Sequence, residues 1–169
     1  MNIKLVVTDI DGVWTDAGMY YDKQGNELKK FNANDGAGVL LLKALSIPIC
    51  IITGEDTEMV KRRAEKLKIE YLFQGTQNKL QKVQSLCNDL NIQLDEIAYV
   101  GDDFNDVKLL RAAGLSACPA NASEYIKREA NWQLQKKGGD GAFREFVERI
   151  LDHHNILEST VAKVLENFS

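Results

Sequence analysis

Short apolar segments alternate with longer amphipathic segments along almost the whole chain, and few folds accommodate that alternation. Three apolar runs are nearly continuous, as strands covered on both faces should be: Ile3–Thr8, Ile47–Thr53 and Ile97–Gly101. Three weaker strand candidates are bounded by Gly, Pro or polar residues: Glu70–Phe73, Leu115–Cys118 and Trp132–Leu134. The pattern predicts an α/β protein with a three-layer, Rossmann-like parallel sheet.

The helix-length segments lie between these strands. Helices are expected after Gly36, over Glu55–Leu67, after Asn78, over Asp103–Ala113 and after Asn121. Thr57, Asn78 and Asn121 are expected to cap or begin three of these helices, because their side chains can accept hydrogen bonds from a first helical turn.

Residues 19–31 break the alternation. Two β-prone arms flank Asp22–Asn26, with Gly25 in the turn, which predicts a projecting β-hairpin. Because this is the largest insertion between core elements, residues 1–169 are expected to form one domain with no cap domain. Residues 137–169 are expected to hold a Gly-rich turn at 137–141, a helix and a helical tail.

Composition excludes several classes of protein. The chain has 169 residues, 44% hydrophobic, and a formal charge of -4. That charge argues against nonspecific binding to nucleic acid or an anionic membrane. The three cysteines, Cys50, Cys87 and Cys118, form no Cys-x-x-Cys pair, which predicts reduced thiols in a cytoplasmic protein without structural zinc. Neither a signal peptide nor a membrane span is expected.

Acidic residues follow two of the expected central strands. Asp9 and Asp11 end the first, and their spacing of two places both carboxylates on the same side of an extended chain. Asp102, Asp103 and Asp106 follow the run that ends at Gly101. Carboxyl ends of parallel strands share one sheet edge, where ligands bind. Clustered carboxylates need a cation, and hard oxygen ligands favour Mg²⁺.

One Asp-x-Asp arises easily by chance, and an Asp after a strand is often only a helix cap. Here the order of several motifs favours function over chance. Asp-x-Asp-Gly follows the first strand, Thr53-Gly54 follows the next, Lys79 opens a later helix, and Gly-Asp-Asp-x-x-Asp comes last. Each member lies at an expected strand end or helix start.

These motifs, from Asp9 to Asp106, resemble the four motifs of the haloacid dehalogenase superfamily. The chain is most similar to a capless branch that contains 3-deoxy-octulosonate 8-phosphate phosphatases and nonulosonate 9-phosphate phosphatases. This closer resemblance covers nearly the whole chain through D-I-D-G-V-W-T-D, the hairpin, F-N-A-N-D-G, I-T-G-E, the Gly-Asp-Asp block and G-G-D-G-A-F-R-E.

The resemblance implies a Mg²⁺-dependent phosphomonoester hydrolase with Asp9 as nucleophile and an aspartyl-phosphate intermediate. Asp11 is expected to act first as general acid and then as general base. Mg²⁺ would be held by the side chains of Asp9 and Asp102 and the backbone carbonyl of Asp11, with Asp103 and Asp106 orienting these ligands.

Two further motif residues suit a phosphoryl group. Thr53 offers a hydroxyl, and the Thr53–Gly54 backbone offers N–H donors. Lys79 supplies a positive charge, although a lysine is more often simply solvated. Both are expected to bind phosphoryl oxygens and to stabilise the transition state.

The substrate class follows from the resemblance, as a 2-keto-3-deoxy sugar acid phosphate. Glu55 stands where the octulosonate phosphatases commonly have Arg, and Arg63 and Lys66 follow it by eight and eleven residues, roughly on one helix face. These three are expected to line the pocket, although such residues usually form a solvated face. The departure favours a nine-carbon nonulosonate 9-phosphate, as in sialic acid biosynthesis, with the eight-carbon octulosonate 8-phosphate as the alternative.

Without a cap domain, the site needs another cover. The resemblance implies a homotetramer in which the hairpin and the Gly-rich segment of neighbouring chains close each site. Arg144 would then pair with the substrate carboxylate; a plain turn followed by a solvated Arg is the alternative.

A response-regulator receiver, a non-enzymatic phosphoacceptor, also gathers acids, a Thr and a Lys around Mg²⁺. Receivers carry the phosphorylated Asp after the third strand, whereas here the Asp-x-Asp pair follows the first. A catalytically idle subunit is disfavoured because every motif residue is intact.

Overall fold

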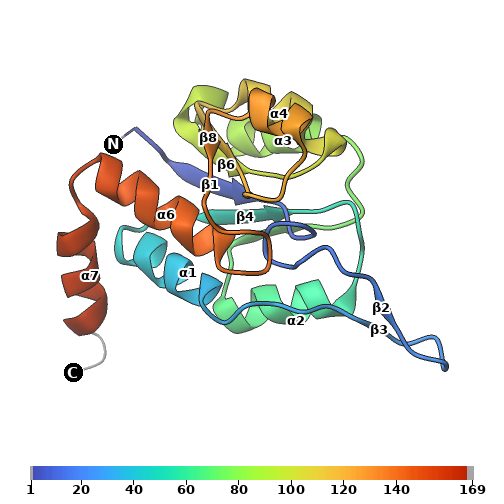
Figure 1. Cartoon of the computed structure of the whole chain (residues 1–169). Helices are drawn as coiled ribbons and strands as arrows, with labels where there is room; N and C mark the ends of the chain where they lie inside the picture. Colours follow the sequence, from blue (N-terminus) through green and yellow to red (C-terminus); the bar gives the residue numbers. More distant parts are fainter. Residues whose placement is uncertain (1, 167–169) are drawn as a thin grey trace.

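The computed structural model describes residues 2–166, which fold around one parallel sheet (Figure 1). The sheet has six strands in the order β5-β4-β1-β6-β7-β8, and every neighbouring pair is parallel. Their bounds are β1 Leu5–Thr8, β4 Ile49–Ile52, β5 Tyr71–Phe73, β6 Ile97–Val100, β7 Leu115–Cys118 and β8 Trp132–Gln133. All six strands fall within the segments predicted from the sequence.

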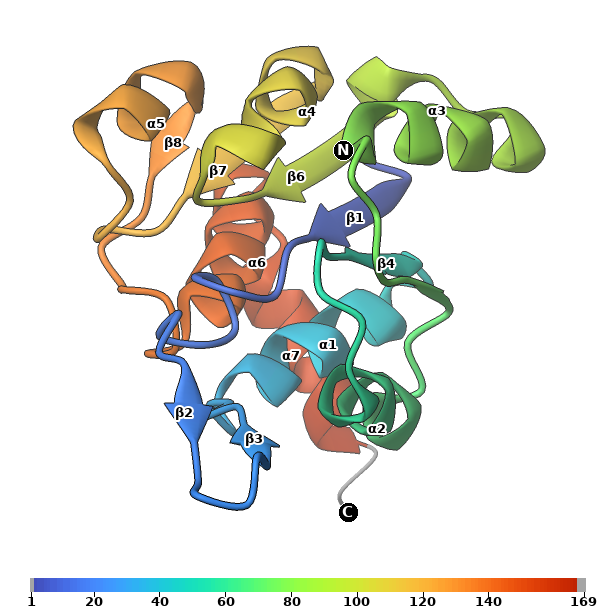
Figure 2. The same ribbon diagram turned by 90° about the vertical axis from the view of Figure 1, so that its right-hand side faces the viewer.

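Helices cover both faces of this sheet (Figures 1 and 2). Residues of α1, α2 and α6 pack on one face with Val6 of β1, and residues of α3, α4 and α5 pack on the other with Leu5 and Val7. The helices are α1 Asp35–Ala44, α2 Glu58–Leu67, α3 Lys79–Leu90, α4 Val107–Ala112, α5 Glu124–Glu129, α6 Ala142–His153 and α7 Leu157–Glu166. The three-layer α/β prediction is confirmed.

The register of the central strands brings three loops together. Thr8, the last residue of β1, lies beside Ile51 of β4 and Val100 of β6. The chain continues past each of these strands into a loop, and the backbone N–H of Asp9 still donates to the Val100 carbonyl at 3.0 Å. The loops after β1, β4 and β6 therefore meet at one edge of the sheet.

The predicted hairpin is present, and it projects beyond the sheet (Figure 2). Its antiparallel strands are β2 Tyr20–Tyr21 and β3 Glu27–Leu28. In the turn, Gly25 has φ +85°, and the Asp22 carboxylate accepts hydrogen bonds from two backbone N–H groups. A β-bridge between Thr15 and Phe31 closes its base.

The Gly-rich turn packs against the loop that follows β1. The backbone N–H of Gly139 donates to the Val13 carbonyl at 3.1 Å. A Cβ added to Gly138 would lie 1.9 Å from the Gly12 carbonyl oxygen, so only glycine permits this approach. The structure thus joins two segments that are far apart in the sequence.

The structure also corrects one helix start and refines two others. Ser123, not Asn121, caps α5, and the Asn121 side chain instead accepts a hydrogen bond from the Gly138 backbone. The segment from Asp103 splits into a 3-10 turn, Phe104–Asp106, and the short helix α4. Thr57 caps α2 as predicted, so the helix begins after Glu55 rather than at it.

No helix within residues 2–166 is long and apolar enough to cross a membrane. Cys50, Cys87 and Cys118 are free thiols.

Asp35 is a buried carboxyl that joins α1 to the start of α6. It accepts a hydrogen bond from the Arg144 backbone at 3.1 Å, and burial raises its pKa to about 6 against the ordinary 3.8. The native state therefore holds a proton more tightly than the unfolded chain does. This carboxyl costs stability increasingly as pH rises from about 4 to about 6.

Replacing Asp35 by asparagine is expected to stabilise the protein at pH 7.5 by about 1–3 kcal/mol and to change little at pH 4. The neutral side chain keeps an oxygen for the Arg144 backbone and loses the cost of a buried charge. Urea unfolding of both proteins across this pH range measures the difference. Asp152→Asn, an exposed change on α6, is the control; a gap between Asp35→Asn and the parent that does not grow with pH would contradict the assignment.

Candidate active site

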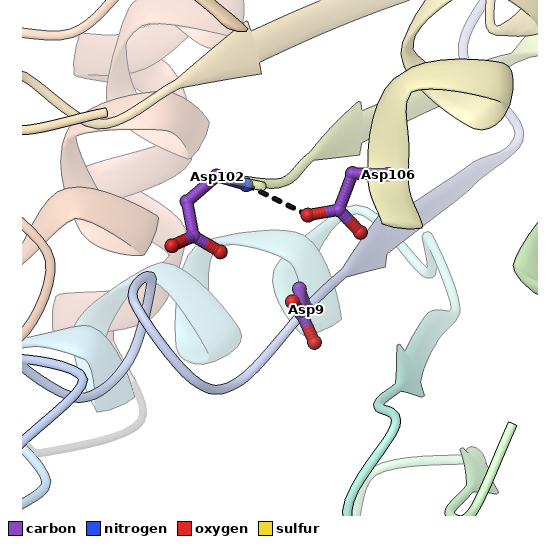
Figure 3. A group of neighbouring side chains, drawn as sticks. All are labelled: Asp9, Asp102 and Asp106. Atoms are coloured by element: carbon purple, nitrogen blue, oxygen red, sulfur yellow. Dashed lines mark hydrogen bonds between the residues drawn. The ribbon is translucent and has the colours of Figure 1, made fainter. Parts of the chain in front are cut away.

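Three carboxylates converge at the sheet edge formed by the ends of β1 and β6. Asp9, Asp102 and Asp106 each offer an oxygen, and these oxygens lie within 4.8 Å of one another (Figure 3). Asp9 follows β1 directly, whereas Asp102 and Asp106 lie in the loop and 3-10 turn after β6. The convergence expected from the topology is therefore found.

Lys79 provides a positive charge inside this cluster. It is the first residue of α3, and its helix is capped by Asn78, as the sequence predicted. Its Nζ lies 2.8 Å from Asp9 Oδ2 and 2.6 Å from Asp106 Oδ1. Burial lowers the pKa of Lys79, but the attraction of the two carboxylates outweighs it, and the pKa is raised above its ordinary value. The ammonium is charged and fixed.

Asp106 organises the loop. One of its oxygens accepts hydrogen bonds from Lys79 and from the Tyr99 hydroxyl. The other accepts from the backbone N–H groups of Asp102, at 2.8 Å, and Asp103, at 3.1 Å. Because donors occupy both oxygens, Asp106 suits the orienting role expected of it better than that of a direct metal ligand.

The single positive charge of Lys79 does not neutralise the carboxylates of Asp9 and Asp102. Burial, then repulsion from Asp106, raises the pKa of Asp9 to about 7. Burial, then repulsion from Asp9 and Asp106, raises the pKa of Asp102 to about 8. Asp9 Oδ1 is buried and has no hydrogen-bond partner within residues 2–166. An unpartnered buried carboxylate oxygen beside a second carboxylate fits a hard divalent cation such as Mg²⁺.

Asp11 lies beside this cluster and is held by the hairpin. Its Oδ1 accepts from Lys29 Nζ at 2.6 Å and from the Thr15 hydroxyl at 3.4 Å. Its Oδ2 is buried, with no partner in the described part of the chain. Sequence reasoning missed Lys29, because nothing in the local sequence distinguishes it from Lys30.

The carboxylates open into a small cleft of about 200 Å³. Its lining comprises Asp9, Asp11, Ala17, Thr53, Gly54, Glu55, Asp102, Asp103 and Asn105. Ligand pockets usually occupy roughly 300–1,000 Å³, so this cleft is smaller than a typical enclosed ligand site. Asn105 was also missed; its only signal is an unassigned position within Gly-Asp-Asp-x-x-Asp.

Besides Lys79, which contacts Asp9 from α3 without lining the cleft, three expected substrate residues lie outside it. Arg63 donates to the Asn32 carbonyl at 3.2 Å, and its guanidinium lies 6.0 Å from the ring centres of Trp14 and Phe31. Lys66 is exposed on α2. The expected helix face shared with Glu55 does not exist, because Glu55 precedes the helix.

Arg144 is the third expected substrate residue that lies outside the cleft. Its side chain pairs with Glu148 at 2.7 Å, and it lines a separate hollow of about 370 Å³ that none of the three clustered carboxylates lines. Arg144 does not line the cleft that contains Asp9, Thr53 and Gly54. Its expected role, which needs a neighbouring subunit, remains a prediction.

Known proteins with similar sequences and structures identify the family. A family model for haloacid dehalogenase-like hydrolases matches residues 68–146. The 3-deoxy-D-manno-octulosonate 8-phosphate phosphatase of Yersinia pestis is 38% identical over 93% of this chain and 84% of its own length. Crystal structures agree with this relationship over similar lengths.

The Moraxella catarrhalis 3-deoxy-D-manno-octulosonate 8-phosphate phosphatase, in complex with a magnesium ion, a phosphate ion and KDO, superposes with a TM-score of 0.91 at 38% identity. The match covers 95% of this chain and 92% of that one. The cobalt-bound Haemophilus influenzae enzyme gives 0.87 at 35% identity, covering 92% and 91%. Together with the acidic cluster, these relatives confirm Mg²⁺ as the cofactor and phosphatase chemistry. The chain therefore belongs to the haloacid dehalogenase-like hydrolases, in the capless branch that contains the 3-deoxy-D-manno-octulosonate 8-phosphate phosphatases.

Proposed function

We propose that this enzyme releases phosphate from 3-deoxy-D-manno-octulosonate 8-phosphate. The observation that carries the proposal is the similarity to phosphatases named for this substrate, which extends over 93% of the chain. The relatives support this eight-carbon substrate better than the nine-carbon substrate favoured by the sequence alone. The cleft between Asp9, Thr53 and Asp102 is the proposed place of reaction.

In the first half-reaction, an Asp9 carboxylate oxygen attacks phosphorus and forms the aspartyl phosphate. The bond from phosphorus to the sugar oxygen breaks, and Asp11 gives its proton to that oxygen. Asp11 suits this role because its side chain lines the same cleft and Lys29 holds one of its oxygens.

In the second half-reaction, Asp11 removes a proton from a water molecule, whose oxygen attacks the phosphorus. The bond from phosphorus to the Asp9 oxygen breaks, and phosphate leaves. Asp9 returns as a carboxylate and Asp11 as an acid, so the residues regain their starting state.

The carboxylates of Asp9 and Asp102 and the backbone carbonyl of Asp11 would hold Mg²⁺. When bound, this ion neutralises negative charge on the phosphoryl oxygens. Lys79 orients Asp9 through its 2.8 Å contact and adds a fixed positive charge. Thr53, buried at the end of β4, would offer its hydroxyl to a phosphoryl oxygen in the transition state; its backbone N–H, expected from the sequence to be a second donor, instead donates to the Phe73 carbonyl at 3.0 Å.

One observation supports the nine-carbon substrate as a second candidate. Glu55, the residue that departs from the octulosonate pattern, lines the cleft together with Asp9. Its carboxylate is available to accept hydrogen bonds from substrate hydroxyl groups.

A phosphate-release assay with both keto acid phosphates, in parallel, tests the proposal. We expect kcat/KM to be at least about tenfold higher for 3-deoxy-D-manno-octulosonate 8-phosphate, a difference of about 1.4 kcal/mol in transition-state binding. Glu55→Gln keeps the shape and removes the charge, and Glu58→Gln, at an exposed α2 position, is its control. A preference for the nine-carbon phosphate that Glu55→Gln abolishes would overturn the eight-carbon assignment.

We also propose a homotetramer and a reducing, cytoplasmic setting. The small open cleft supports closure by a neighbouring chain, and the three free thiols support the compartment. Arg63, Lys66 and Arg144 would reach a substrate only across such an interface.

A further inference from the structure

Lys29 is one of two consecutive lysines in the second arm of the hairpin, and the two have different surroundings. The Lys29 side chain is 2% exposed and the Lys30 side chain 67%. Lys29 Nζ lies 2.6 Å from Asp11 Oδ1 and 3.8 Å from Glu27, whereas Lys30 Nζ lies 3.5 Å from Asp16. The buried lysine faces the cleft residue, and the exposed one faces the base of the hairpin.

The burial of Lys29 makes its contact more than a surface ion pair. An exposed pair contributes little, because water solvates both partners and both side chains lose freedom. The Lys29 ammonium is buried although the Asp11 side chain is 29% exposed, and a buried ammonium needs fixed partners. The charge-assisted bond at 2.6 Å therefore fixes Asp11 Oδ1 in one place.

The second oxygen of Asp11 is left without a hydrogen bond in the part of the chain that the structure describes. Oδ2 is buried and has no partner within residues 2–166, while Thr15 adds only a long 3.4 Å contact to Oδ1. With Oδ1 held by the hairpin, the orientation of the whole carboxyl group depends on Lys29. No other side-chain cation within residues 2–166 forms an ion pair with Asp11.

We propose that Lys29 is a positioning residue that holds the Asp11 carboxyl group in the orientation needed to deliver a proton to the leaving sugar oxygen and to take one from water. This inference rests on the proposed function, because it uses the acid–base role of Asp11. It makes the hairpin part of the catalytic apparatus of its own protomer, in addition to any cover it gives a neighbour.

Lys29→Met tests the proposal, because methionine keeps the length of the buried chain and removes the ammonium. We expect the rate of the first turnover on 3-deoxy-D-manno-octulosonate 8-phosphate to fall by about 10- to 100-fold, since a misplaced acid loses much of its advantage. Lys29→Arg should restore part of the rate. Lys30→Met, the adjacent charge removal, should keep the parent rate.

A substrate whose leaving group needs no proton distinguishes the loss of a positioned general acid from a general loss of activity. p-Nitrophenyl phosphate releases a stable anion that needs no proton, so the first turnover of Lys29→Met on this ester should stay within about threefold of the parent. Equal losses on both esters, or a Lys29→Met enzyme that behaves like Lys30→Met, would overturn the proposal.

Assays of the parent enzyme distinguish a failure of the proposed substrate from a failure of the Lys29 proposal. If it does not hydrolyse the eight-carbon phosphate, the proposed substrate is wrong, and the nine-carbon phosphate replaces it in the comparison with p-nitrophenyl phosphate. The Lys29 proposal stands or falls on the difference between the two leaving groups.

Discussion

Asp9→Asn is expected to lower the rate of phosphate release by a factor on the order of 10⁵, as removal of a hydrolase nucleophile does. An amide cannot form the bond to phosphorus, and it also weakens the negative site for Mg²⁺. The loss should appear in kcat with any phosphate ester. In the parent, rapid acid quenching followed by mass spectrometry should find a phosphate on the peptide that contains Asp9.

Asp89→Asn makes the same chemical change at an exposed position on α3 and should leave turnover unchanged. An Asp9→Asn enzyme that retains near-parental turnover, or a quenched parent with phosphate on another residue, would show that the nucleophile has been assigned wrongly.

Lys79→Met is expected to destabilise the protein without metal by about 3–5 kcal/mol, because it leaves two buried carboxylates without their cation. Lys79 is 1% exposed and contacts Asp9 and Asp106 directly. Loss of a fixed charge near the phosphoryl group should also lower kcat by about 10²–10³-fold. Urea unfolding with and without Mg²⁺, together with phosphate release, measures both effects.

Lys61→Met removes a half-exposed lysine whose i,i+3 contact with Glu58 is 3.7 Å long. It should change the free energy of unfolding by less than about 0.5 kcal/mol. Mg²⁺ should stabilise Lys79→Met more than the parent, since the ion offsets the same charge deficit. Equal unfolding curves for Lys79→Met and Lys61→Met would show that the buried ion pairs do not contribute as argued.

The fold and the carboxylate cluster could be predicted from the sequence because both depend on local patterns. Apolar runs without alternation identify buried parallel strands, and residues directly after such strands must meet at one edge. Asp9 and Asp102 are placed by that rule alone. Asn78 could be identified as a cap of α3 because its role concerns only the next few residues.

Residues whose position depends on distant packing could not be predicted. Lys29 reaches Asp11 because the hairpin folds back over the β1 loop, and no local pattern records that contact. Asn121 was expected to begin a helix, but its side chain binds the Gly138 backbone, which arrives from a later turn. Arg63 was placed by helical spacing from Glu55, a spacing that fails because Glu55 lies outside α2.

The close approach of Gly138 to Gly12 has a consequence for biosynthesis. Val13 lies only four residues after Asp9, yet its carbonyl gains its backbone partner, the N–H of Gly139, only when residue 139 has emerged from the ribosome. A nascent chain that carries all four phosphatase motifs is therefore still unfinished at its reaction centre, since contacts so distant along the chain form late. Activity should therefore begin only after residue 139 has emerged and this turn has packed on the loop after β1.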